Sequence, residues 1–169
     1  MQDQAQLHNR KAIDKLKDIV KHNSLCMMVT DVANYPGHSR PMAVAEVDDE
    51  GNFWFLTLRT TAKFAELTID PRMSLYFADP SHQEFLTMQG RVEVLNDMAR
   101  KKELWSPLAG AWVPDGVDNP DLRILKMTPE GGYYWDTKDG KLVAGIKIAV
   151  ALITGKTNDD GGIEGRLTV

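Results

Sequence analysis

Short β-type segments separated by compact polar turns constrain the fold of this chain more than any other feature. Residues 40–47 and 53–58 flank the polar stretch 48–52, which has the composition of a hairpin turn. Asn34-Tyr35-Pro36-Gly37 is a second strong turn signal. Because consecutive strands usually pair, the pattern predicts a mostly antiparallel sheet in which 40–47 pairs with 53–58.

The same reading along the whole chain predicts a small barrel of about six strands, with helices over its openings. Alternation of strands and helices typical of a doubly wound fold is absent. The segments are expected to form one domain over 1–169. Strands are predicted at 25–32, 40–47, 53–58, 73–78, 85–95, 122–128 and 132–136, with a small edge strand at 165–169. Helices are predicted at 5–22, 61–69, 97–105 and 142–155, and 106–121 is predicted to be a loop with one helical turn.

Composition excludes several classes of protein. The 169 residues are 43% hydrophobic and 26% charged, values of an ordinary globular domain. A formal charge of −4 argues against nonspecific nucleic-acid binding, which needs a dense cationic surface. The longest apolar stretch, 142–154, contains Lys147 and is too short to span a bilayer. We expect a cytoplasmic protein with no nucleic-acid or membrane partner.

The single cysteine, Cys26, excludes an intrachain disulfide and Cys-rich metal sites. It lies within the apolar run Leu25-Cys26-Met27-Met28-Val29, which predicts a small buried hydrophobe rather than a reactive thiol. The four histidines lack the paired spacing of metal ligands, so no metal site is predicted. They are His8, His22, His38 and His82.

Common nucleotide and hydrolase motifs are absent. Gly155-Lys156-Thr157 resembles the end of a phosphate-binding Walker A loop, but Val150 stands where that motif needs its first glycine. The chain contains neither the G-x-G-x-x-G of dinucleotide folds nor the G-x-S-x-G of α/β-hydrolases.

One arrangement does indicate an anion site. The strand predicted at 53–58 runs into Arg59-Thr60-Thr61-Ala62-Lys63, where a helix is predicted to begin. A helix start exposes free backbone N–H groups and a partial positive charge, which favours phosphate. The alternative, a capped helix with solvated cations, is the commoner outcome for these residue types. Arg40, at the start of the paired strand, is expected on the same sheet as this cradle.

Taken in order, these segments resemble the pyridoxamine 5′-phosphate oxidase-like superfamily of FMN-binding split barrels, and within it the general stress protein branch. The resemblance covers roughly residues 5–157. It rests on Ser39-Arg40-Pro41-Met42-Ala43-Val44, Asp49-x-Gly51-x-x-Trp54-Phe55-Leu56-Thr57, Thr60-Thr61-x-Lys63, Asp70-Pro71-Arg72-Met73-Ser74-Leu75, Gly90-Arg91-Val92-Glu93-Val94 and Tyr133-Tyr134-Trp135.

This resemblance implies a six-stranded antiparallel split barrel that forms a homodimer, with FMN bound at the subunit interface. It implies that Lys63 holds the FMN phosphate, although Ala62 replaces the arginine that the oxidases carry just before it. Arg59 or Arg40 is then the candidate substitute. The implied cofactor-binding residues are Arg40, Pro41, Met42, Ala43, Val44, Thr57, Leu58, Arg59, Thr60, Thr61 and Lys63.

Tryptophans near such a site can stack on a flavin ring, and we single out Trp112 and Trp135 over Trp105. The arginine and histidine set with which vitamin oxidases hold pyridoxamine is absent from 145–169, which disfavours that activity. We expect an FMN-dependent oxidoreductase of unknown substrate, with NAD(P)H a candidate donor and no catalytic residue identified. The alternatives are a non-catalytic flavin-binding or sensing stress protein, a split barrel that uses haem or deazaflavin, and an interaction module without a cofactor.

Overall fold

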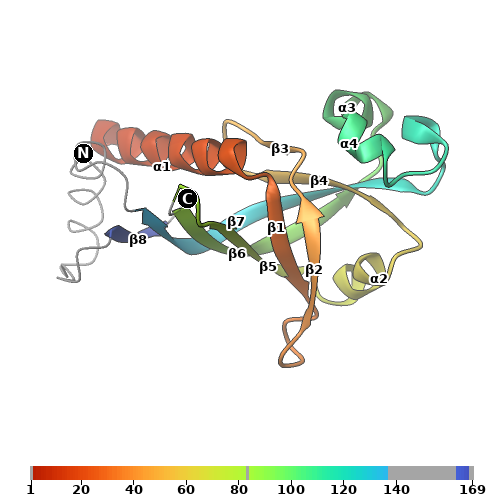
Figure 1. Ribbon diagram of the computed structural model, residues 1–169, viewed down its shortest axis with the longest axis horizontal. Helices are drawn as coiled ribbons and strands as arrows, with labels where there is room; N and C mark the ends of the chain where they lie inside the picture. The colour runs from red at the N-terminus through yellow and green to blue at the C-terminus, as the bar shows by residue number, and fades with distance from the viewer. Residues whose placement is uncertain (1, 83, 137–162, 168–169) are drawn as a thin grey trace.

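One antiparallel sheet, curled on itself, forms the body of the computed structural model, which describes residues 2–82, 84–136 and 163–167 (Figure 1). Seven strands lie in the order β2-β1-β5-β6-β7-β4-β3, and β8 pairs with β7. The strands are β1 (Leu25–Thr30), β2 (His38–Ala43), β3 (Glu46–Val47), β4 (Phe53–Leu58), β5 (Arg72–Asp79), β6 (Glu84–Leu95), β7 (Leu122–Asp136) and β8 (Ile163–Leu167). The helices are α1 (Gln2–His22), α2 (Ala62–Ile69), α3 (Met98–Leu104), α4 (Pro107–Gly110) and the 3₁₀ turn η1 (Gly116–Asp118).

The two outermost strands of this order, β2 and β3, are neighbours in the chain. Only Val44 and Ala45 separate them. The Val44 N–H donates to the Ser24 carbonyl just before β1, and the Ala45 N–H donates to the Trp54 carbonyl in β4. Because two consecutive residues bond to opposite edges of the sheet, the sheet must curl until those edges meet. This confirms the split-barrel class with peripheral helices.

The predicted pairing of 40–47 with 53–58 is wrong for most of its length. That segment is divided into β2 and β3, and β2 pairs with β1 in the register Arg40 opposite Met28. Only Glu46 and Val47 pair with β4. The physical reason is the crossing at Val44, where the chain leaves one edge of the sheet and joins the other. The 48–52 turn does connect β3 to β4 as predicted.

The seven strands in the sheet order, plus β8, exceed the six that were expected. The predicted break between strands 122–128 and 132–136 is wrong, because β7 is continuous and 15 residues long. Gly131 pairs with Gln89 and Pro129 with Gly90, so Glu130 has no partner on β6 and forms a β-bulge. A Cβ atom at Gly132 would lie 2.2 Å from the Thr87 carbonyl oxygen, so only glycine fits this close approach of the two strands.

Other predicted boundaries are close to the observed ones. The N-terminal helix predicted at 5–22 begins at Gln2, and the loop 106–121 holds α4 and η1 rather than one helical turn. The tail strand predicted at 165–169 is β8, shifted to Ile163–Leu167. The helix predicted at 142–155 lies outside the described residues. Within the described residues, no helix has the length and apolarity needed to cross a bilayer.

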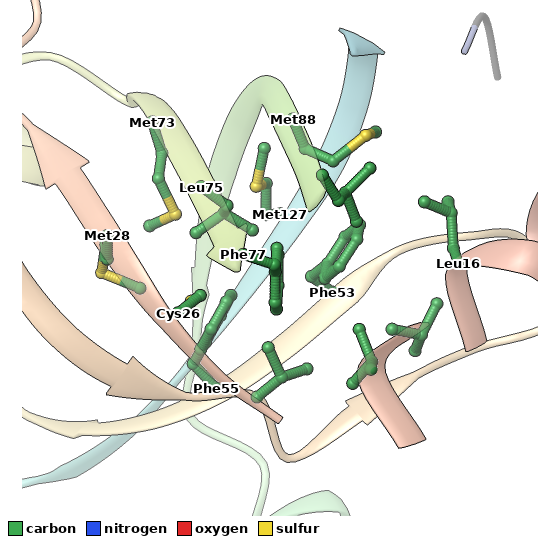
Figure 2. Close-up of a cluster of buried hydrophobic side chains, with 14 of the residues drawn as sticks. Leu16, Cys26, Met28, Phe53, Phe55, Met73, Leu75, Phe77, Met88 and Met127 are labelled. Atoms are coloured by element: carbon green, nitrogen blue, oxygen red, sulfur yellow. The ribbon is translucent and has the colours of Figure 1, made fainter. Parts of the chain in front are cut away.

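The interior of the curled sheet is filled by side chains from α1 and from β1, β4, β5, β6 and β7 (Figure 2). Phe53 and Phe77 meet at a ring-centroid distance of 6.0 Å. Cys26 lies in this cluster, and burial raises the pKa of its thiol to about 12, which confirms the expectation of an unreactive buried side chain. A second, smaller cluster forms where α3 packs on β4 and β7, around Trp54, Leu104 and Ile124.

Polar contacts hold the C-terminal end of α1 against the turn before β6. The buried Glu84 carboxylate accepts from the Lys15 ammonium at 3.1 Å and contacts His22 Nδ1 at 2.9 Å. The His22 ring stacks on His82 at 4.8 Å, and His82 Nδ1 contacts Asp79 at 2.7 Å. These contacts supplement the apolar face of α1 that enters the core.

We expect Glu84→Ala to destabilise the fold by about 3 kcal/mol or more, because it removes the buried carboxylate that accepts from Lys15 and contacts His22. Urea unfolding monitored by circular dichroism measures this free energy. Glu130→Ala is the control, since its ion pair with Arg91 is exposed on both sides and is worth about 0–1 kcal/mol. Equal losses for the two variants would show that the Lys15–Glu84 contact does not anchor α1.

Candidate functional site

The candidate site is built around the turn that joins β4 to α2. The Thr61 hydroxyl donates to the Leu58 carbonyl at 2.8 Å and lies 3.4 Å from the buried Thr57 hydroxyl. Thr61 is the N-cap residue of α2, but its side chain makes no capping hydrogen bond to the helix backbone. The start of α2 therefore keeps backbone N–H groups that no side chain caps, together with the positive end of the helix dipole.

Lys63 stands in the first turn of α2 and is half-buried. Among the residues that the structure describes, its ammonium has neither a hydrogen-bond acceptor nor an ion-pair partner. Burial lowers the pKa of Lys63, and the charge of Arg40 lowers it further, while Glu66 opposes both. The ammonium is thus a partly desolvated cation next to another cation, an environment that a bound anion would relieve.

Arg40 reaches the same helix from β2. Its guanidinium donates to Thr30 Oγ1 at 2.5 Å and to Glu66 Oε2 at 2.9 Å. His38 Nδ1 contacts the other oxygen of Glu66 at 2.7 Å. Burial alone would raise the pKa of Glu66, but hydrogen bonds from Thr30, His38 and Arg40 outweigh it and lower the pKa below its usual value of 4.5. Arg40 is therefore held beside Lys63 by a carboxylate that is ionised at neutral pH.

Three residues of this network, Thr30, His38 and Glu66, were not predicted from the sequence. One signal was available for Glu66, because it stands three residues after Lys63 and so shares a helix face with it. Nothing comparable marked His38 or Thr30. They join the network only because β2 pairs with β1 instead of β4, which sets His38 opposite Thr30.

Of the other predicted residues in this region, Arg59 and Thr60 lie in the exposed turn before α2. The Arg59 Nε donates to Asp121 at 2.5 Å, so its charge is already paired on the side of the turn that faces β7. Arg59 is accordingly a poor replacement for the family arginine missing at Ala62. Arg40 is the cation that the structure brings towards Lys63.

The remaining predicted residues of β2, and Val44 just after it, differ in exposure and in backbone bonding. The Val44 side chain is buried in the core and its N–H bonds to Ser24. Met42 is half-buried against the core, and its carbonyl accepts from the Cys26 thiol. Pro41 is exposed, and Ala43 is half-buried. Since β2 is the last strand of the sheet order, one backbone edge of Pro41–Ala43 has no strand partner among those described.

The two tryptophans lie apart from this cluster. Trp112 is 78% exposed in the turn after α4. Arg123, near the start of β7, is the residue opposite Thr57 on β4. Trp135 lies twelve residues further along, near the other end of β7. Neither tryptophan meets the start of α2 within this chain. A role for Trp135 in the same site therefore requires a second copy of the chain.

A separate group of titratable side chains, Asp18, His22 and Glu84, has ligand atoms within 4.8 Å of one another. One Glu84 oxygen is bonded to Lys15, and the His22 ring is stacked nearly parallel to His82. The other Glu84 oxygen contacts His22 Nδ1 at 2.9 Å, so neighbouring side chains already engage both carboxylate oxygens. This group fits the clamp on α1 better than a metal site.

The geometry at the start of α2 suits an anionic oxygen group. Uncapped N–H groups and the Lys63 ammonium supply donors and positive charge within one helical turn. We find no acid–base pair at this turn in the described part of the chain. The site can bind and orient a ligand, and redox chemistry would have to come from that ligand.

Comparison with known protein families and solved structures agrees with this fold. The family described as pyridoxamine 5′-phosphate oxidase like matches residues 11–159, most of the chain. The chain belongs to the pyridoxamine 5′-phosphate oxidase-like family. No curated protein sequence matches it.

Several solved structures share the family fold. A protein from Jannaschia, provisionally named general stress protein 26, is 26% identical over the whole of both chains, with a TM-score of 0.67. A general stress FMN/FAD binding protein from Xanthomonas citri is 26% identical over 78% of this chain and 91% of that one, with a TM-score of 0.64. A relative of general stress protein 26 from Clostridium acetobutylicum is 27% identical over 75% and 89%, with a TM-score of 0.61.

Within this family fold, the Glu66 network makes a pH-dependent contribution to stability. We expect Glu66→Gln to cost about 2 kcal/mol at pH 7, because it removes charge-assisted hydrogen bonds to Arg40 and His38. A carboxyl whose folded-state pKa is lowered stabilises the fold above its unfolded-state pKa and loses that contribution as pH falls through the folded-state value. The stability difference between wild type and variant should therefore shrink as pH falls from the usual glutamate value of 4.5 through the lower folded-state pKa of Glu66, in urea unfolding from pH 2 to 7. Parallel curves across that range would contradict an ionised Glu66.

Proposed function

We propose that this chain is an FMN-binding flavoprotein of the general stress type, with the cofactor phosphate held at the start of α2. The observation that carries the proposal is the half-buried Lys63 ammonium, which lacks an acceptor among the described residues and stands beside an uncapped helix start. The flavin named for the Xanthomonas citri relative supports the same choice of cofactor.

Charge at this turn fits a phosphate dianion. The Glu66 carboxylate offsets the charge of the Arg40 guanidinium through their ion pair. Lys63 and the helix dipole then supply the uncompensated positive charge. A phosphate there would accept from Lys63 and from the first N–H groups of α2. Thr57 would lie beneath the bound phosphate, and Leu58 would lie next to it. The unpaired edge of β2 offers backbone groups to the flavin ring.

The outer face of the sheet supports a homodimer. Register places Pro41, Met27, Tyr76, Thr87 and Tyr133 directly opposite one another across β2, β1, β5, β6 and β7. Directly opposed residues project from the same face, and the row spans roughly 19 Å at the usual strand spacing. Its larger members are exposed, as are Leu25 and Phe85 beside it.

A contiguous apolar face of this kind is typical of a surface covered by a partner. We propose that the partner is a second copy, which would bring Trp135 and the β2 edge of two chains to one interface. The cofactor site would then be shared between subunits. Trp112, exposed in the turn after α4, is the other aromatic candidate for contact with the flavin.

We propose an oxidoreductase function for the dimer. When bound, FMN supplies the redox chemistry, and the protein supplies binding, orientation and electrostatics. NAD(P)H is the donor to test first, and a cytoplasmic location fits the single buried thiol. The second candidate is a non-catalytic flavin store or sensor. Haem and deazaflavin are the alternative cofactors.

Purified protein separates these candidates. A yellow protein with flavin absorbance supports FMN, whereas a protein that stays colourless after incubation with FMN contradicts the proposal. Bleaching by NADH or NADPH under anaerobic conditions would identify an enzyme. A flavin that binds but is not reduced would identify a store or sensor.

We expect Lys63→Ala to weaken FMN binding by roughly tenfold to a hundredfold, the effect of losing one charge-assisted contact. Quenching of flavin fluorescence gives the dissociation constant. Riboflavin, which lacks the phosphate, should bind wild type and variant alike. The matched control is Lys21→Ala, an exposed lysine near the end of α1. An unchanged affinity for FMN would remove Lys63 from the site.

We expect Tyr76→Glu to convert the dimer into a folded monomer, because it places a charge at the centre of the apolar row. Light scattering after size-exclusion chromatography measures the mass, and circular dichroism checks the fold. Tyr35→Glu is the control, since Tyr35 is 98% exposed at the β1–β2 turn and lies off this row. A Tyr76→Glu protein that remains dimeric would place the interface elsewhere.

A further inference from the structure

Glu66 is a carboxylate that stands next to the turn at which an anion is proposed to bind. It follows Lys63 by three residues on α2, so the two side chains are neighbours on one face of the helix. Only 16% of the Glu66 side chain is exposed, and α2 lies beside the end of the β1–β2 hairpin where Thr30 pairs with His38 (Figure 1). A negative charge in this position repels a phosphate, so it weakens the site unless it serves another purpose there.

The hydrogen bonds of Glu66 run to β1 and β2 and leave Lys63 aside. Oε2 accepts from Arg40 Nη2 at 2.9 Å and from the Thr30 hydroxyl at 2.5 Å, and Oε1 contacts His38 Nδ1 at 2.7 Å. The Thr30 hydroxyl also accepts from Arg40 Nη1, which closes a triangle of hydrogen bonds. Lys63 makes no ion pair with Glu66 in the part of the chain that the structure describes. The carboxylate therefore engages the cation of β2 and leaves the cation of α2 free.

The same bonds limit what Arg40 contributes to a ligand. Both terminal nitrogens of its guanidinium are engaged, one by Thr30 and the other by Glu66. A phosphate at the start of α2 is attracted by Arg40 and repelled by Glu66 from nearly the same distance, because the two groups are in contact. Turning Arg40 towards the phosphate would break a charge-assisted hydrogen bond that is largely shielded from water. The ion pair thus acts on the ligand as a neutral unit.

We propose that Glu66 is a specificity-determining residue of this site, which withholds the charge of Arg40 from the ligand phosphate. Selectivity for a phosphorylated flavin over riboflavin then comes from Lys63 and the start of α2. This inference rests on the proposed function, because it concerns how that same site recognises a phosphate monoester. It gives Arg40 a role different from that of a substitute for the arginine missing at Ala62.

A positioning role for Glu66 predicts the opposite result. If the carboxylate held Arg40 as a direct phosphate ligand, removal of the carboxylate would weaken the binding of FMN. If it offsets Arg40, its removal adds one positive charge to the site and strengthens the binding of FMN. The direction of one change in affinity therefore separates the two roles.

The test compares the full chain with Glu66→Gln, with Arg40→Gln and with the double variant. Flavin fluorescence at low, constant ionic strength and neutral pH gives the affinities for FMN and riboflavin. We expect Glu66→Gln to bind FMN roughly fivefold or more tightly than wild type, and Arg40→Gln to bind it roughly fivefold or more weakly. The double variant should bind FMN more tightly than Arg40→Gln, because it removes the repulsion that the single variant leaves. Riboflavin, which carries no phosphate, should respond much less.

Glu103→Gln is the matched control. It removes a carboxylate that is also paired with an arginine, Arg100, but on α3, and it should leave the affinity for FMN unchanged. Circular dichroism checks the fold of every variant. Should Glu66→Gln fail to fold, the double variant still decides, because removal of both members of a partly buried ion pair is commonly tolerated.

Weaker or unchanged FMN binding by Glu66→Gln, or a double variant that binds as weakly as Arg40→Gln, would overturn this role of Glu66. A wild type that binds neither flavin would instead refute the proposed function. Inorganic phosphate then serves as the probe, in isothermal titration calorimetry with chloride as the reference salt. The same order of affinities among the variants would support the role of Glu66, and equal affinities or no binding by any of them would overturn it.

Discussion

The step from Val44 to Ala45 is the constraint on which the rest of this structure depends. Two consecutive backbone N–H groups bond to opposite edges of one sheet, the first at Ser24 and the second at Trp54. No flat sheet can satisfy both bonds, because five strands separate those edges in the strand order. Closure encloses the core, and it also brings β2 round to the side of the barrel where α2 begins.

The anion site follows from that closure. Arg40 and His38 alternate with Pro41 along β2, so they project towards the inner side of the barrel and reach Glu66 on α2. Glu66 then has two effects on the site. It fixes the Arg40 guanidinium in place, and it offsets one of two adjacent positive charges. What remains is a single uncompensated ammonium, Lys63, at a helix start, which suits one phosphate group better than a more extended polyanion.

Local sequence was sufficient for the parts of the site that are contiguous in the chain. The strand at 53–58, the turn at 59–61 and the helix carrying Lys63 were predicted, because hydrophobic alternation and turn chemistry act over a few residues. The partner of Arg40 was predicted incorrectly, since strand pairing is decided by the closure of the whole sheet. The bulge at Glu130 was missed for the same reason, because Pro129 and two glycines signal a turn unless a partner strand holds them in line. His38 and Glu66 could not be linked without the correct pairing.

The outer apolar row and the anion site are connected through β2. Alternation along this strand sends Arg40 inward to Glu66 and sends its neighbour Pro41 outward, opposite Met27. A partner that covers the row therefore also packs against the strand whose free edge adjoins the site. Any movement of β2 that accompanies loss of the partner would displace Arg40 and Pro41 together, because adjacent residues of one strand cannot shift independently. Dimer formation and cofactor affinity are accordingly expected to be coupled through this one strand.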